Sequence, residues 1–223
     1  MPLKGVAFVT DETHYNDVFL PEDWTEEQLM IRDMVKDFCL QEIHGLGIEK
    51  AAALDASKDL DLIVSMLEKS AELGLCGLSI DKEYGGMDLD FNTGLLFGEA
   101  ISLGFSFATT IGAQTSIGSL PIVFYGTPEQ KQKYLPGIAS AKLKASYCLT
   151  EPGAGSDANS GKTKATLSAD GKTYLLNGQK MWITNGGFAD IFIVFAKIED
   201  DKDLSAFIVE KAFGGITLGK EEK

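Results

Sequence analysis

Two short stretches decide how this chain is interpreted: YCLTEPGAGSD at residues 147–157 and QKMWITNG at residues 179–186. Each is rich in hydroxyl groups and glycine, and each follows residues typical of a β-strand. Loops of this kind can bring backbone N–H groups and hydroxyls close to a flat ligand with polar edges, because glycine lets the backbone approach closely. The two stretches therefore predict a ligand site at the ends of strands.

Upstream of these stretches, residues 25–143 have the apolar spacing of three and four that is typical of amphipathic helices. Thr25 and Gln28 form a plausible capping box at the start of the first helix. Residues 92–103 and 105–117 are nearly uncharged. Because a helix that is apolar on all sides is usually buried, these two segments predict the centre of an all-α domain.

From about residue 144 the period changes to two, which is typical of β-strands. Residues 163–167 and 173–176 predict a hairpin, and residues 191–196 and 205–209 predict two further apolar strands. The sequence therefore predicts an α+β multidomain protein in three parts: an N-terminal lead-in at 1–24, an all-α domain at 25–143, and an antiparallel β-sandwich or barrel-like domain at 144–223. Because no closing strand follows residue 209, we expect the β-domain to be incomplete and the chain to belong to a longer protein.

Composition disfavours several classes of function. The 223 residues include 44% hydrophobic and 24% charged residues, which is ordinary for a soluble globular protein. A net charge of −13 with a single arginine, Arg32, argues against binding to nucleic acid or to an anionic membrane surface. No apolar run approaches the roughly 20 residues that a membrane-spanning helix needs. We therefore expect no nucleic acid partner and no membrane binding from this segment.

The cysteines and histidines give no sign of a metal site or a disulfide framework. Cys39, Cys76 and Cys148 are odd in number and have apolar neighbours, which predicts buried free thiols in a reducing compartment. His14 and His44 have no ligating residue at metal-site spacing.

Residues 153–158 match G-x-G-x-x-A, the dinucleotide-binding fingerprint, but their context does not fit it. That fingerprint requires a tight strand–turn–helix, whereas here Glu151-Pro152 precedes the glycines and a strand-like run follows them. We therefore reject a nicotinamide-binding Rossmann fold. A simple turn between two domains stays open as an alternative for this stretch. Trp182 as a core aromatic and Thr184 as an ordinary strand residue stay open for the second.

Taken together and in this order, the motifs resemble the acyl-CoA dehydrogenase family. The landmarks are YGG at 84–86, QK at 130–131 with YLP at 134–136, TEP at 150–152, GSD at 155–157, and NG at 177–178 with WITNG at 182–186. The lead-in before Thr25, and the pair GAQTSIG at 112–118 and FGGIT at 213–217, resemble its very-long-chain class most closely. The resemblance implies FAD-dependent α,β-dehydrogenation of a fatty acyl-CoA, in particular a long-chain one, to the trans-2-enoyl-CoA. It also implies electron transfer to an electron-transfer flavoprotein, a homo-oligomer (dimer or tetramer), and a cytoplasmic or mitochondrial matrix location.

By the same resemblance, backbone N–H and hydroxyl groups in the two loops would donate hydrogen bonds to the flavin and stabilise the negative charge of its reduced form. Trp182 would cover one face of the ring. The implied FAD-binding residues are Tyr147, Leu149, Thr150, Gly155, Ser156, Trp182, Ile183 and Thr184. The implied substrate-binding residues are Ser156, Gln114, Thr115 and Gly118. Gly118 would leave room for a long acyl chain or would equally allow close packing of elements, and the polar Gln114 leaves the depth of the pocket open.

No catalytic residue is predicted in this chain. The family's base is a glutamate in a C-terminal helical domain, which would lie beyond residue 223, so the chain alone is expected to be inactive. Glu99 lies on the uncharged helix but at no motif position. Two alternatives remain: an acyl-CoA oxidase with the same domains, and a non-catalytic flavin- or acyl-CoA-binding or assembly module.

Overall fold

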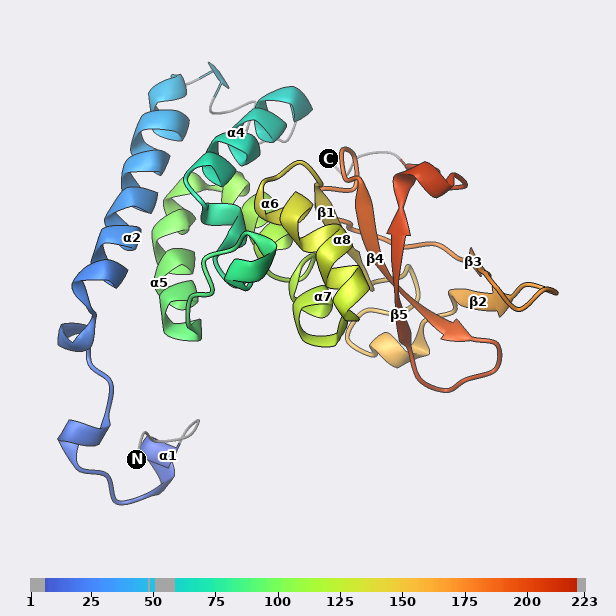
Figure 1. Ribbon diagram of the computed structural model, residues 1–223, viewed down its shortest axis with the longest axis horizontal. Helices are drawn as coiled ribbons and strands as arrows, with labels where there is room; N and C mark the ends of the chain where they lie inside the picture. The colour runs from blue at the N-terminus through green and yellow to red at the C-terminus, as the bar shows by residue number, and fades with distance from the viewer. Residues whose placement is uncertain (1–6, 48, 51–58, 220–223) are drawn as a thin grey trace.

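The computed structural model describes residues 7–47, 49–50 and 59–219 (Figure 1). Helices make up the first part of the chain and a sheet makes up the last part, as predicted. The α-helices are α1 (Ala7–Thr10), α2 (Glu26–Phe38), α4 (Leu60–Glu72), α5 (Phe91–Ile101), α6 (Ser106–Thr115), α7 (Leu120–Tyr125) and α8 (Pro128–Ala139). The strands are β1 (Ala145–Cys148), β2 (Lys164–Leu167), β3 (Tyr174–Asn177), β4 (Ile191–Ile198) and β5 (Ser205–Glu210).

The predicted capping box of α2 is present. The backbone N–H of Gln28 donates to the Thr25 hydroxyl at 3.2 Å, and the Gln28 side chain accepts from the Thr25 N–H at 3.0 Å. Capping satisfies N–H groups that have no partner inside the helix, which fixes where α2 begins. Apolar residues of α2, α4, α5 and α6 then form one core, which includes Val35, Leu67 and Ile111.

The prediction that both uncharged helices are buried holds only in part. On α6, Phe107 and Ile111 are buried, whereas on α5 the side chains of Phe91 and Leu95 are 80% and 57% exposed. Composition could not reveal this difference, because an apolar face that looks outward has the same residues as one that packs inward.

Helices α7 and α8 lie between the helical part and the sheet (Figure 1). Pro128 occupies the first turn of α8, as predicted, and Ile122 and Ile138 from the two helices join a second core with Ile191 and Ile193 of β4. This second core holds the sheet against the helices.

The sheet differs from the predicted antiparallel arrangement because it is mixed. Strands β2 and β3 form the predicted hairpin, and β4 and β5 are also antiparallel. However, β4 pairs in parallel with β1, with Ala145 opposite Ile191, and in parallel with β2. Turn residues predict only pairing between neighbours in sequence, so the return of the chain to β1 after residues 149–190 left no signal in the pattern.

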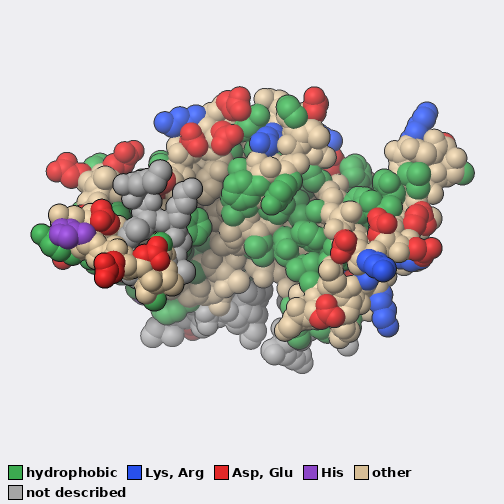
Figure 2. Space-filling view, turned by 90° about the horizontal axis from the view of Figure 1, so that it is seen from below, with side chains coloured by type: hydrophobic (Ala, Val, Ile, Leu, Met, Phe, Trp, Pro, Cys, Tyr) green, Lys and Arg blue, Asp and Glu red, His purple; other side chains and the backbone are tan. Residues whose placement is uncertain are grey.

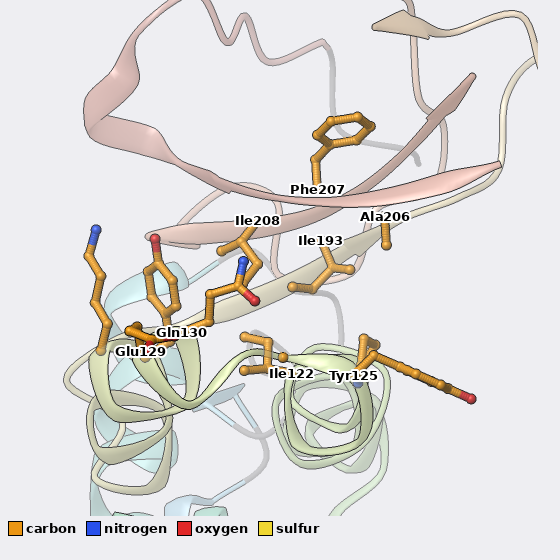
Figure 3. Close-up of a pocket in the computed structure, with 12 residues that line it drawn as sticks. Ile122, Tyr125, Glu129, Gln130, Ile193, Ala206, Phe207 and Ile208 are labelled. Atoms are coloured by element: carbon orange, nitrogen blue, oxygen red, sulfur yellow. The ribbon is translucent and has the colours of Figure 1, made fainter. Parts of the chain in front are cut away.

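The face of the molecule shown in Figure 2 gathers hydrophobic side chains over its middle, between acidic groups nearer its edges. A groove of about 460 Å³ lies between α7, α8 and the β4–β5 hairpin. Ile122, Ile193 and Ile208 point toward one another in it, whereas Phe207 points away from the helices (Figure 3). The groove contains none of the predicted site residues. Within the described ranges, no helix is both long enough and apolar enough to cross a membrane.

Candidate functional site

The two motif stretches lie side by side in the structure. The N–H of Met181 donates to the carbonyl of Thr150 at 2.9 Å, and the ammonium of Lys180 donates to the carbonyl of Leu149 at 3.0 Å. Residues that are about 30 positions apart in sequence are thereby joined backbone to backbone at the end of β1. The prediction that both stretches contribute to one site is consistent with this contact.

Glu151 links the two motif stretches through a buried ion pair. Its side chain is 7% exposed and forms an ion pair with Lys180 at 2.8 Å. The same carboxylate accepts hydrogen bonds from the Lys162 N–H at 2.6 Å, the Thr163 N–H at 3.0 Å and the Thr163 hydroxyl at 2.5 Å. Burial alone would raise the pKa of Glu151, but the bonds from Lys180, Thr163 and the two N–H groups outweigh it and lower the pKa to about 2.

Around this junction the surface offers the groups that a flat cofactor with polar edges needs. Thr150 and Thr184 are half-buried, and their hydroxyls make no hydrogen bond to any residue in the described part of the chain. The Trp182 side chain is 68% exposed, and its backbone φ of 57° holds it in the left-handed region that side chains other than glycine rarely adopt. These features fit the FAD ring that the resemblance implies.

The glycine-rich turn leaves open space beside these groups. A Cβ atom built on Gly153 or on Gly155 would meet no heavy atom within 4 Å, and Ser156 is exposed. Such open backbone allows a ligand to approach N–H groups closely. Gly155 and Ser156 are therefore accessible, as a ligand-binding role requires.

Asn185, which follows Thr184, fastens the second loop to both domains. Its side-chain nitrogen donates to the carbonyl of Thr110 on α6 at 3.0 Å and to the carbonyl of Ala145 on β1 at 3.2 Å. Its side-chain oxygen is buried and has no hydrogen-bond partner among the described residues. The Ser146 hydroxyl adds a bond of 2.6 Å to the carbonyl of Thr184.

Two of the predicted flavin contacts place their side chains elsewhere. Tyr147 packs its ring against Phe195, with ring centres 5.0 Å apart, on the sheet face that belongs to the second core. Ser146 and Cys148 point to the opposite face, because side chains alternate along a strand. Ile183 packs with Cys148 and Phe192 in a small third core. Both side chains are half-buried in these contacts, which favours contact with a ligand at the loops through their backbone groups.

Gln114 is a structural link in this structure, which does not fit the predicted substrate contact. Its side chain is fully buried. Its nitrogen donates to the carbonyls of Ile138 at 3.0 Å and Leu143 at 2.8 Å, and its oxygen accepts from the Ala145 N–H at 2.7 Å. Both polar atoms are occupied, so neither is available to a substrate.

The surroundings of Gly118 fit the alternative that this glycine allows close packing of elements. A Cβ at this position would lie 2.6 Å from the Ala113 carbonyl oxygen and 2.8 Å from the Ala145 Cβ, so the glycine permits close approach of the helical segment to β1. On α6, by contrast, a Cβ at Gly112 would meet nothing within 4 Å, and Thr115 is half-buried with its hydroxyl donating to the Ile111 carbonyl. Open space therefore lies beside Gly112.

The three cysteines are free and buried. Burial raises the pKa of the Cys148 thiol to about 12, with Lys180 opposing the shift, and burial raises those of Cys39 and Cys76 to about 11. The part of the chain that the structure describes contains no group of three His, Cys, Asp or Glu side chains that could hold a metal ion.

Sequence reasoning missed the roles of Glu151, Lys180 and Asn185. All three lie within or beside the motif stretches, but only the fold shows that Glu151 and Lys180 are buried and paired. The one available signal was a carboxylate and an ammonium group that lie within the two motif stretches predicted to form a ligand site.

Comparisons with known proteins agree with the motifs. Residues 25–142 match the family model described as acyl-CoA dehydrogenase, N-terminal domain, and residues 146–223 match the acyl-CoA dehydrogenase middle domain. A probable acyl-CoA dehydrogenase of Bacillus subtilis is 46% identical over 99% of this chain and 36% of that protein. The rat mitochondrial very long-chain specific acyl-CoA dehydrogenase is 45% identical over 70% of this chain and 25% of that protein.

Among solved structures, an acyl-CoA dehydrogenase from Bacillus anthracis complexed with FAD superposes with a TM-score of 0.91. It is 45% identical to this chain, and the match covers 98% of this chain and 37% of that one. The chain thus spans between a quarter and about two fifths of the length of these three proteins.

Proposed function

Because this chain belongs to the acyl-CoA dehydrogenase family, we propose that it forms the first two domains of an FAD-dependent enzyme that oxidises a long-chain fatty acyl-CoA to the trans-2-enoyl-CoA. The observation that carries the proposal is the junction of the two loops. The Met181–Thr150 hydrogen bond brings accessible hydroxyls, an exposed indole and open glycines to one place. When bound there, FAD supplies the two-electron acceptor for the reaction.

In this proposal the chain's own residues bind and orient the cofactor. The N–H groups of Leu149 and Thr150 and the hydroxyls of Thr150 and Thr184 donate to the flavin, which favours negative charge on its reduced form. Trp182 covers one ring face, and Gly155 and Ser156 line the entry of the phosphate-bearing arms. Tyr147 and Ile183 contribute backbone groups only.

The acyl chain is proposed to follow α6 past Thr115 and the open side at Gly112. Gln114 and Gly118 are left out of this path, because the first has no free polar atom and the second packs against β1. Each buried methylene contributes only about 0.8 kcal/mol, so a preference for long chains would arise from the length of the whole path.

The proton-abstracting base is proposed to lie outside this chain. Glu99 is an exposed residue of α5. Glu151 lies close to the site, but a carboxylate whose pKa is lowered to about 2 and whose oxygens already accept four hydrogen bonds is a poor base near neutral pH. We therefore expect this chain alone to bind FAD weakly and to lack dehydrogenase activity.

For the whole protein we propose an electron-transfer flavoprotein as the acceptor, a homodimer or homotetramer as the assembly, and the cytoplasm, or the mitochondrial matrix in a eukaryote, as the compartment. Reoxidation of the substrate-reduced full-length protein in air tests the acceptor. Slow reoxidation is expected, whereas fast reoxidation would identify an oxidase.

The central experiment is a flavin absorption spectrum of the full-length protein before and after anaerobic addition of palmitoyl-CoA, with butyryl-CoA for comparison. Bleaching of the flavin band by palmitoyl-CoA is expected. A well-folded protein without flavin would instead support a binding or assembly module.

A matched pair of variants ties this result to the site. Thr184→Val removes one proposed donor without changing side-chain size, and losing a hydrogen bond of about 0.5–1.5 kcal/mol should weaken FAD binding about 2- to 10-fold. Thr166→Val on the exposed side of β2 is the control and should leave FAD binding unchanged. Equal affinities in the two variants would remove Thr184 from the proposed site.

A further inference from the structure

The Glu151–Lys180 ion pair ties together three separate segments of the β-domain. Lys180 bonds to the Leu149 carbonyl and to the Glu151 carboxylate, both on the first loop. The Glu151 carboxylate in turn accepts hydrogen bonds from the N–H groups of Lys162 and Thr163, which immediately precede β2. Thr163 also lies close to Gly178, which immediately precedes the second loop, because a Cβ at Gly178 would lie only 2.3 Å from the Thr163 hydroxyl oxygen.

Stability alone is a weak reason for such a pair. The side chains of Lys180 and Glu151 are only 11% and 7% exposed, so both charges are largely removed from water. Replacing a buried ion pair by apolar residues is often neutral or stabilising, because desolvation offsets the attraction between the charges. What apolar residues could not reproduce is the direction of these bonds, which hold particular backbone atoms at fixed distances.

The position of the pair says which atoms are held. Thr150 immediately precedes Glu151, and Trp182 follows Lys180 by two residues. The Lys180 ammonium donates to the Leu149 carbonyl, and the Met181 N–H donates to the Thr150 carbonyl. The peptide planes that contain these carbonyls, and with them the N–H groups of Thr150 and Glu151, are therefore fixed as well. The first loop and the start of the second therefore cannot separate without breaking a buried, charge-assisted bond.

We propose that Glu151 and Lys180 are positioning residues, which set the separation between the hydrogen-bond donors of the first loop and the Trp182–Thr184 segment of the second. The inference rests on the proposed FAD site. It predicts that the pair controls both the affinity for FAD and the reduction potential of bound flavin. It assigns no contact between either side chain and the cofactor.

The test uses the full-length protein with Lys180→Met. A second variant, Glu151→Gln with Lys180→Met, keeps one uncharged oxygen that can accept from Thr163, although it cannot also replace the oxygen that accepts from the Lys162 N–H. It leaves no unpaired charge, so it is expected to fold if the single variant does not. Lys133→Met is the matched control, because it removes the Lys133–Glu210 ion pair of 2.6 Å, whose lysine is 60% exposed. FAD affinity is measured by flavin fluorescence on apoprotein at a temperature where circular dichroism shows each variant folded, and the flavin potential is measured by dye equilibration.

In both Lys180 variants the dissociation constant for FAD should rise at least about tenfold, which corresponds to about 1.4 kcal/mol, and the flavin potential should become more negative as the donors move away. The control should match the unaltered protein in both quantities. Unchanged FAD affinity and flavin potential in folded variants would overturn the inference, because the loss of a purely structural ion pair would lower only the unfolding temperature. Absence of FAD binding in the unaltered protein would overturn the proposed function itself.

Discussion

Replacing Gln114 by methionine should destabilise the full-length protein by about 3 kcal/mol. Methionine has nearly the same volume as glutamine, so the change removes the amide without opening a cavity. The Ala145 N–H and the Leu143 carbonyl then lose the bonds that Gln114 gave them, whereas the Ile138 carbonyl still accepts from the Ala141 N–H at 3.0 Å. Two buried polar groups left without a partner cost about 1–3 kcal/mol each, and the better burial of methionine returns part of that.

The assay is thermal unfolding followed by circular dichroism. For domains of this size, 1 kcal/mol corresponds to a change of about 2–4 °C in Tm, so the variant should unfold about 6–12 °C below the unaltered protein. Gln132→Met, which makes the same change at an exposed position of α8, is the control and should shift Tm by less than about 2 °C. If the two variants unfold together, the three hydrogen bonds of Gln114 do not join α6, α8 and β1 as the structure indicates.

Three further results are expected. The pKa of Glu151 is lowered from 4.5 to about 2 in the folded state, so its ionisation stabilises the protein by about 3 kcal/mol above pH 4.5, and this contribution is lost as the pH falls from 4.5 towards 2. Glu151→Gln should therefore make the decline in unfolding free energy between pH 4.5 and 2 shallower. An unchanged decline would contradict the assignment of the lowered pKa to Glu151. Cys39, Cys76 and Cys148 should react with a thiol reagent at pH 8 only after denaturation, since burial raises all three pKa values above 10; rapid labelling of the native protein would show that one of them is accessible. Gly118→Ala should lower the unfolding free energy by about 1–3 kcal/mol, because the added methyl group overpacks against β1. Gly112→Ala places its methyl group in open space on a helix and should raise the unfolding free energy by up to about 1 kcal/mol. Urea unfolding that ranks the two variants the other way would refute the packing role of Gly118.

The sequence predicted what depends on local chemistry. The capping box at Thr25, the Pro128 helix start and the β2–β3 hairpin each follow from bonds or turns within a few residues. The parallel pairing of β1 with β4 depends on segments about 45 residues apart, for which a single sequence carries no turn signal. The same limit applied to the site. The motifs predicted the two loops, whereas the buried hydrogen bonds of Gln114 go to residues 24 to 31 positions away, which only the fold brings together.

The parallel pairing of β1 with β4 also has a consequence for the order of events during folding. The candidate-site residues that follow Cys148 lie in the segment 149–190, which connects β1 to β4. The two ends of this segment come together only when β4 pairs with β1. Closing a long loop costs entropy before any contact is gained, so this step should be slow relative to the formation of the helices. Among the described residues β1 pairs with β4 alone, so during synthesis this pairing forms only after residues 191–198 have left the ribosome. The two motif loops should therefore take shape after the helices that precede them in the chain.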